Sequence, residues 1–121
     1  MNIYGSVDLD PWLSTEPTFL WRIPAPRLGT WASVNYPNPF NPVTRIDFSV
    51  EQDGARTRIR IYDVAGGLVR TLMDQAMHAG RHTAIWDGRN GERQSVASGL
   101  YFARIQIGTG FEKMQKMMLV R

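Results

Sequence analysis

The sequence has no cysteine among its 121 residues. Disulfides, thiolate nucleophiles and cysteine-ligated zinc or iron–sulfur sites are therefore excluded. It also has no apolar run near the ~20 residues that a membrane-spanning helix requires. The first residues lack the basic segment and apolar stretch of a secretory signal, so an exported protein would carry its signal elsewhere. We therefore expect the chain to be the tail end of a longer protein.

Catalytic fingerprints are also missing. There is no nucleophile elbow, phosphate-binding loop or dinucleotide motif, and we interpret Gly108-Thr109-Gly110 as a hairpin turn. A triad could be drawn from Ser98, His82 and Asp87, but their spacing does not show that they meet. A small hydrolase is the least favoured alternative, and we predict that the chain is not an enzyme.

Acidic residues beside glycines suggest a second kind of enzyme, a glycosidase. A glycosidase would need two carboxylates, for which Asp63, Asp87 and Glu92 are candidates. Asp63 and Asp87 also suit the capping of turns, because a short acidic side chain accepts hydrogen bonds from nearby backbone N–H groups. We favour the capping role.

Metal binding is not expected. His78 and His82 would share a face only on a helix, and the sequence predicts a strand there. Asp87, Asn90 and Glu92 carry oxygen ligands in one loop, but Arg89 stands where a calcium loop places another oxygen donor. We predict no metal and no cofactor.

The composition indicates one globular domain. The chain of 13.8 kDa is 43% hydrophobic and carries 11 glycines and 7 prolines. Residues 1–33 contain closely spaced prolines and Trp12, Trp21 and Trp31, which predicts an irregular arm or the remnant of an upstream domain. The stretch NIYGSVDLDPWL at 2–13 resembles the closing repeat of parallel β-helix proteins. The second predicted unit is residues 34–121.

From Thr44 onward, apolar residues recur with a period of two, which is typical of half-buried strands. The predicted strands, separated by glycine-containing turns, are 44–50, 58–63, 68–73, 80–86, 99–107 and 111–120. A short helix at 68–77 is rejected, since glycines stand close on both sides. The predicted core is Ile46, Phe48, Ile59, Ile61, Val69, Leu72, Trp86, Tyr101, Ile105 and Leu119. We predict an all-β, immunoglobulin-like antiparallel sandwich of about seven strands.

The net charge of +3 does not favour nucleic acid as a partner. The cations Arg56, Arg58 and Arg60 alternate singly with apolar residues, which is typical of the solvent face of a strand. The last predicted strand is different: Met114, Met117, Met118, Leu119 and Val120 are apolar on both of its faces, with Lys113, Lys116 and Arg121 as cationic guards. Such a strand is either central in a sheet or open to strand addition or self-association.

Five motifs in order resemble the C-terminal sorting domain of type IX secretion systems, which is similar to the immunoglobulin-like domain of the flagellar hook-capping protein. They are NYPNPFNPVTRIDFSV, IYDVAGGLVRTL, AGRHTAIWDGRN, VASGLYFARI and KMQKMMLVR. The resemblance implies a non-catalytic module that directs a cargo protein through the outer-membrane translocon to the cell surface or the medium. Its partners would be the translocon and the sorting machinery.

The resemblance also marks candidate recognition residues: Pro37, Asn38, Pro39, Gly99, Tyr101, Lys113 and Lys116. A purely structural role is the alternative for these residues. The prolines would blunt a sheet edge while Phe40 and Tyr36 enter the core, and Tyr101 would pack inside. The alternative function is a carbohydrate- or protein-binding module that uses the tryptophans of the arm, if these lie exposed in a row.

Overall fold

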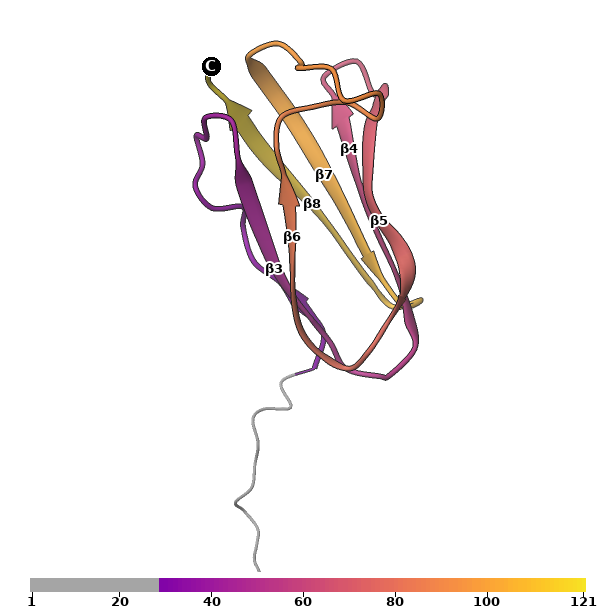
Figure 1. Ribbon diagram of the computed structural model, residues 1–121. Helices are drawn as coiled ribbons and strands as arrows, with labels where there is room; N and C mark the ends of the chain where they lie inside the picture. Colours follow the sequence, from indigo (N-terminus) through magenta and orange to yellow (C-terminus); the bar gives the residue numbers. More distant parts are fainter. Residues whose placement is uncertain (1–28) are drawn as a thin grey trace, which may run out of the picture.

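The computed structural model describes residues 29–121, which form two antiparallel sheets and no helix (Figure 1). The strands are β2 (Trp31–Ala32), β3 (Thr44–Val50), β4 (Ala55–Asp63), β5 (Leu68–Met77), β6 (Gly80–Trp86), β7 (Gly99–Ile107) and β8 (Phe111–Leu119). One sheet has the order β2-β3-β6 and the other β5-β4-β7-β8. The predicted all-β sandwich is confirmed. β2 extends it into residues assigned above to the arm; the remainder of the arm, with Trp12 and Trp21, lies outside the described residues.

β5 is a strand, as predicted, and it continues to Met77. It pairs antiparallel with β4, and the register shifts between Ile59 and Arg60 and again between Ile61 and Tyr62. The turn between the two strands is capped by Asp63, whose Oδ1 accepts the N–H of Ala65 at 3.0 Å and of Gly67 at 2.8 Å. The capping role predicted for Asp63 is therefore confirmed.

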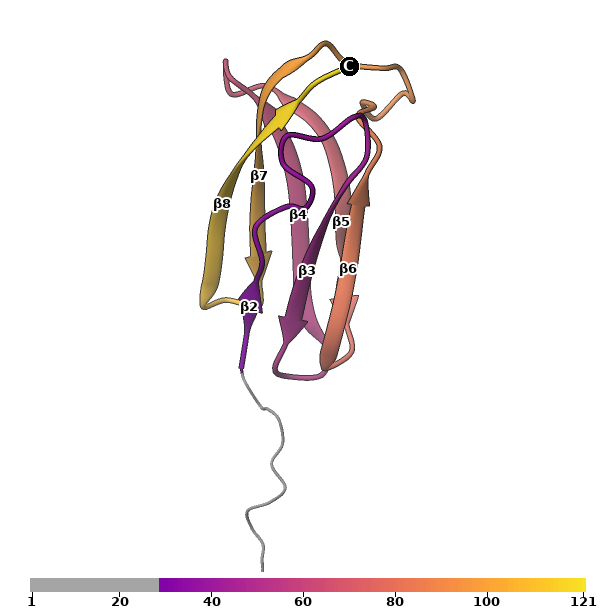
Figure 2. The same ribbon diagram turned by 90° about the vertical axis from the view of Figure 1, so that its left-hand side faces the viewer.

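The core lies between the sheets, which face each other in Figure 2. Trp86, 1% exposed, is its largest fully buried side chain. Its ring lies 5.5 Å from that of Phe40 and 5.2 Å from that of Tyr101, measured between centroids. The indole N–H donates to the Arg89 carbonyl oxygen at 2.9 Å, so the polar atom of this buried side chain is satisfied.

Two members of the predicted core are only half-buried. Val69 and Leu72 pack against the core from β5, which is an edge strand with an irregular register. The other predicted members are buried, and the core also includes Phe40, Val50, Ala84, Ala103, Ile107 and Met117. Trp86 and Leu119 are fully buried although β6 and β8 are edge strands too, so what sets β5 apart is its irregular register, which the period-two pattern does not encode.

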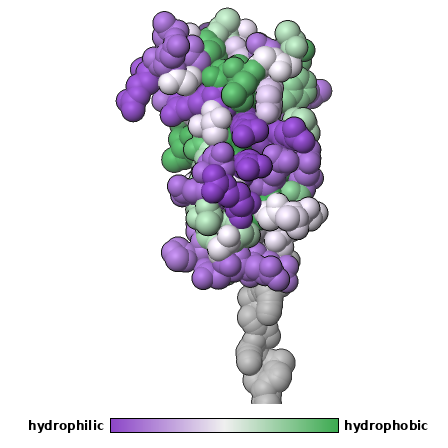
Figure 3. All heavy atoms as spheres, turned by 90° about the vertical axis from the view of Figure 1, so that its right-hand side faces the viewer, coloured by the Kyte–Doolittle hydropathy of each residue, from purple (hydrophilic) through white to green (hydrophobic). Residues whose placement is uncertain are grey.

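The outer face of the four-stranded sheet is polar over its middle (Figure 3). Arg56 and Arg58 of β4 donate through Nε to Asp74 Oδ1 of β5, at 2.9 Å and 3.2 Å. Hydrogen bonding from Arg56, joined by Arg58, lowers the pKa of Asp74 below its ordinary value of 3.8. The arginines thus occupy the solvent face, as predicted.

This ion pair predicts a pH-dependent contribution to stability. Because the pKa of Asp74 is lower in the folded state, its contribution is present above about pH 4 and is lost as pH falls through the folded-state value. Asp74→Asn is therefore expected to unfold at lower urea concentration than the wild type at pH 7, with the difference shrinking at pH 3. A difference between the two midpoints that is equal at both pH values would contradict this prediction.

Candidate recognition site

Residues 35–43, here called the proline loop, lead from β2 to β3 and reach the outer edge of β8. The N–H of Phe40 donates to the Met118 carbonyl oxygen, and the N–H of Val120 donates to the Phe40 carbonyl oxygen, both at 2.9 Å. The Phe40 side chain is 2% exposed, whereas Tyr36 is 71% exposed. The predicted blunting of a sheet edge and the burial of Phe40 are confirmed, and the predicted burial of Tyr36 is wrong. Tyr36 is the residue whose backbone bonds Arg45, at the start of β3.

Asn38 binds the same edge through its side chain. Its Nδ2 donates to the Lys116 carbonyl oxygen at 3.2 Å, and its Oδ1 accepts the Met118 N–H at 3.0 Å. A side-chain amide has the same donor and acceptor groups as a peptide bond. Asn38 therefore takes the place of one residue of a neighbouring strand, and the exposed Pro37 and Pro39 flank it.

A buried polar chain lies behind this edge. Asn35, which is 2% exposed, donates through Nδ2 to Thr44 Oγ1 at 3.0 Å, and its Oδ1 accepts from Gln115 Nε2 at 3.0 Å. Thr44 Oγ1 in turn donates to the Pro37 carbonyl oxygen at 2.8 Å. These bonds fix the proline loop between β3 and β8. Sequence reasoning missed them; the only signal was a glutamine among apolar residues on one face of the last strand.

Gly99 and Tyr101 lie on the other side of β8, in β7. Gly99 pairs with Leu119 and Tyr101 with Met117. Gly99 has a φ of 149°, which residues with a side chain rarely adopt. Tyr101 is 7% exposed, as predicted, and its hydroxyl donates to the Ala97 carbonyl oxygen at 2.7 Å. Burial raises the pKa of this hydroxyl.

The three cationic guards of β8 are in different surroundings. Lys113 is half-buried, and its Nζ donates to the Ala32 carbonyl oxygen at 2.9 Å, linking β8 to β2. Lys116 is exposed. Arg121 binds the loop before β7: its N–H donates to Ser98 Oγ at 2.9 Å and its Nε to the Val96 carbonyl oxygen at 2.7 Å. Arg121 is therefore a loop anchor rather than an edge guard.

β8 is an edge strand, so of the two predicted alternatives the central position is excluded. Its apolar residues divide between the two faces. Met117 and Leu119 are fully buried, whereas Met114 is 56% and Met118 36% exposed. The structure thus places all the predicted recognition residues on or beside β8: Pro37, Asn38 and Pro39 at its outer edge, Gly99 and Tyr101 on the neighbouring strand, and Lys113 and Lys116 on β8 itself. Their role in recognition remains a prediction.

The candidate catalytic residues have other partners in residues 29–121. Ser98 Oγ accepts the backbone N–H described above, and His82 Nε2 lies 2.7 Å from the His78 carbonyl oxygen. Asp87 Oδ1 accepts from Arg70 Nη1 at 2.8 Å and from the backbone N–H of Arg89 at 3.1 Å. No hydrogen bond within this part of the chain joins two members of the suggested triad. The predicted turn-capping role of Asp87 is confirmed.

The candidate metal ligands are also engaged locally. His78 Nδ1 lies 3.1 Å from Asp53 Oδ1. Asn90 Oδ1 accepts the backbone N–H groups of Glu92 at 2.9 Å and Gln94 at 3.0 Å, so it closes the loop on itself. Over residues 29–121 no group of three or more histidine or acidic side chains could hold a metal ion. In the same range no helix is long and apolar enough to cross a bilayer.

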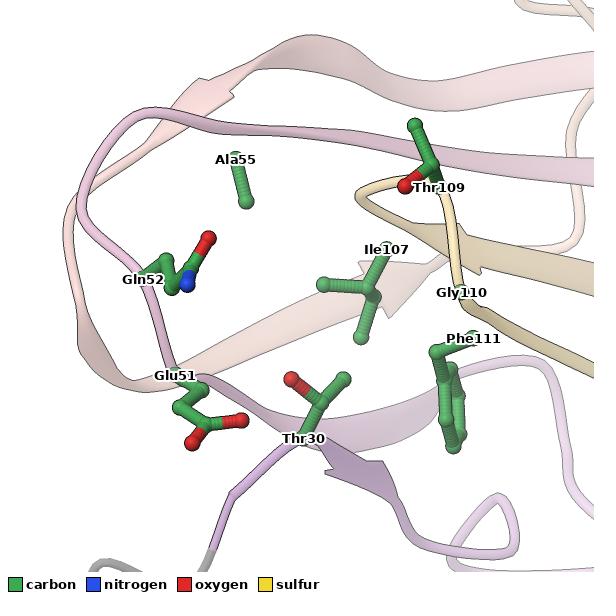
Figure 4. A pocket seen from close by; sticks show the side chains of 8 residues that line it. All are labelled: Thr30, Glu51, Gln52, Ala55, Ile107, Thr109, Gly110 and Phe111. Atoms are coloured by element: carbon green, nitrogen blue, oxygen red, sulfur yellow. The ribbon is translucent and has the colours of Figure 1, made fainter.

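A hollow of about 420 Å³ opens at one end of the sandwich, where the β3–β4 turn and the β7–β8 hairpin meet (Figure 4). The residues that line it are Thr30, Glu51, Gln52, Ala55, Ile107, Thr109, Gly110 and Phe111. Glu51 is the one titratable side chain in this set. The hollow therefore offers no second group with which a carboxylate could share acid–base chemistry.

Trp31 is the one tryptophan of the arm within the described residues. It is half-buried in β2, and the Arg81 guanidinium carbon lies 5.8 Å from the centroid of its ring. A guanidinium over the ring is a favourable cation–π contact and covers one face of the indole. This contact favours a structural role for Trp31 over a platform for sugar stacking.

Two antiparallel sheets packed face to face, with β8 held between β7 and the proline loop, define an immunoglobulin-like β-sandwich module. The sequence model of the FlgD Ig-like domain matches residues 38–110, and the chain belongs to this family. The match covers β3 to β7 and ends before β8. No curated protein matches the chain.

Two solved structures contain a similar fold. The crystal structure of dimeric latent PorU from Porphyromonas gingivalis matches with a TM-score of 0.60 and 21% identity, over 75% of this chain and 9% of that one. PorZ, described as an essential surface component of the type-IX secretion system of the same bacterium, matches with a TM-score of 0.45 and 22% identity, over 77% of this chain and 12% of that one. At these identities the likeness concerns the fold alone. The chain spans about a tenth of either protein.

Proposed function

We propose that this chain is a non-catalytic targeting module that directs a cargo protein through the type IX secretion system to the cell surface or the medium. Five motifs in the family's order support the proposal. The observation that carries it is the position of the proline motif: Asn38 and Phe40 bind the outer edge of β8, where the final motif lies. Motifs at opposite ends of the domain therefore form one continuous surface.

That surface presents groups that a secretion partner could recognise. Pro37, Asn38 and Pro39 are exposed on it, and Tyr36 is 71% exposed beside them. The backbone of this loop is already held by its bonds to β3 and β8, so a partner would have to order little additional backbone. The surface belongs to folded β-structure, so we propose that the translocon and the sorting machinery bind the folded module. Catalysis by the module's own side chains is not part of this proposal.

Reversal of charge on β8 tests the proposal. In a bacterium with a type IX system, a reporter that carries the chain at its C-terminus is expected to be exported, and Lys113→Glu with Lys116→Glu is expected to reduce export at least tenfold. Lys116 is exposed, so its change alters the charge offered to a partner with a cost in stability within about 0.5 kcal/mol. Lys113 also loses its bond to Ala32, so the urea midpoint of the double variant is measured as well.

The matched control is Arg89→Glu with Arg93→Glu, which makes the same change in net charge on the loop between β6 and β7. This control is expected to leave export unchanged. Export of the β8 variant at the wild-type level, with its fold intact, would remove the lysines from the recognition surface. Failure of the wild-type chain to export the reporter would overturn the targeting function itself.

A further inference from the structure

Half of the outer edge of β8 is open within residues 29–121. The bonds of Asn38 to Lys116 and Met118 show that even-numbered residues of β8 direct their peptide groups away from β7. In this part of the chain no hydrogen bond reaches the peptide groups of Glu112 and Met114. Figure 2 shows this half of β8 at the margin of the described domain. Unpaired edges of this kind are templates for another strand.

The side chains beside this open edge suit a second copy of the same strand. In an antiparallel pair centred on Met114, Glu112 lies opposite Lys116 of the second copy, and Lys116 lies opposite Glu112 of the second copy. Opposite charges directly across an antiparallel pair are stabilising, and the two-fold symmetry doubles the effect. On the other face Lys113 meets Gln115, so like charges do not face each other.

Neighbouring registers are less favourable. A pair centred on Glu112 places two carboxylates opposite each other, and a pair centred on Lys113 or Lys116 places two ammonium groups opposite each other. The pairs centred on Gln115 and Lys116 also need the Met118 peptide group, which Asn38 and Phe40 already occupy. The proline loop therefore confines pairing to residues 112–116. Within that range the Lys116 carbonyl oxygen already accepts from Asn38 Nδ2 and Gln115 Nε2, so the pair depends on the peptide groups of Glu112 and Met114 and on the Lys116 N–H.

We propose that the chain forms a symmetric dimer through residues 112–116 of β8, joining two four-stranded sheets into one continuous sheet. Met114, 56% exposed, lies at the two-fold axis and contacts its counterpart. Arg104 pairs with Met114 in the ladder and donates through Nε to Glu112 Oε2 at 2.9 Å, so it adds a cation beside the axis. Five residues of edge contact bury little surface, so the dimer is weak and depends on concentration.

Sedimentation equilibrium of the full chain, up to about 1 mM, tests the dimer. Lys116→Glu places carboxylates opposite each other at both ends of the pair, and the dissociation constant is expected to rise at least tenfold. The double variant Glu112→Lys with Lys116→Glu restores opposite charges, and it is expected to return to within about threefold of the wild type. Arg104 lies diagonal to both positions, so the exchange keeps an acidic neighbour for it.

Met114→Pro is a second, uncharged test. The Met114 N–H faces away from β7, so proline removes a donor from the open edge and none from the β7–β8 ladder. The variant is expected to be monomeric at the same concentrations, with an unchanged circular dichroism spectrum. If this variant unfolds, the dimer is tested by the two charge variants alone, Lys116→Glu and Glu112→Lys with Lys116→Glu. A wild-type chain that is monomeric at about 1 mM, or a dimer that Lys116→Glu leaves unchanged, would overturn the proposal.

Discussion

Trp86→Ala is expected to lower the free energy of unfolding by about 3–5 kcal/mol. The side chain is 1% exposed and lies between the rings of Phe40 and Tyr101, so its removal leaves a cavity that joins the proline loop to β7. Alanine also leaves the Arg89 carbonyl oxygen without the indole donor. Both losses destabilise the folded state, so they lower the free energy of unfolding together.

Urea denaturation at pH 7 measures this loss. Ile85→Ala is the matched control, because Ile85 is the neighbour of Trp86 in β6, points to the opposite face and is 61% exposed. Its cost is expected to stay below about 1 kcal/mol, the range of strand propensity. A Trp86→Ala midpoint as high as that of the control would contradict the central position of this residue in the core.

Phe40→Ala is expected to cost about 3–5 kcal/mol as well, and to loosen the end of β8. The ring is 2% exposed and contacts Trp86, while the Phe40 peptide group pairs with the two residues that flank Leu119. Without the ring the loop loses the anchor that holds it to this edge. The amide of Val120, which donates to the Phe40 carbonyl oxygen, should then exchange with solvent faster than amides in the β4–β7 ladder.

Tyr36→Ala is the control within the same motif. Tyr36 is 71% exposed, so its removal is expected to change stability by no more than about 0.5 kcal/mol. Urea midpoints and native-state hydrogen exchange are measured for both variants. Equal behaviour of the Phe40 and Tyr36 variants would show that the loop does not depend on a buried aromatic residue.

The strands and the sandwich could be predicted from the sequence because both are local properties. A strand with one buried face shows alternating apolar residues, and β3 and β7 do so over most of their length. Asp63 and Asp87 could be predicted as turn caps for the same reason, since their partners lie within four residues. The burial of Tyr101 followed from its place on the apolar face of β7.

Long-range contacts could not be predicted. The residues that bond Asn38 lie 78 and 80 positions away, and Asn35 and Gln115 are 80 positions apart. Pattern reasoning treats the two aromatic residues of the proline motif alike, although only Phe40 meets the core. Which of them turns inward depends on where the loop crosses β8. The apolar composition of β8 left open whether this strand is central in its sheet. Its position at the edge depends on which strands pair with each other, and that is again a long-range property.

The chain of buried polar bonds from Thr44 through Asn35 to Gln115 has a consequence for the order of folding. It joins the first long strand to the last, and Phe40 reaches the same last strand. A nascent chain that has emerged only as far as β7 has the Thr44 partner of Asn35 but none for the Asn35 Oδ1 or for the edge-binding groups of Asn38. Since contacts of such large sequence separation form late, we expect the domain to stay open until β8 arrives and then to close in one cooperative step.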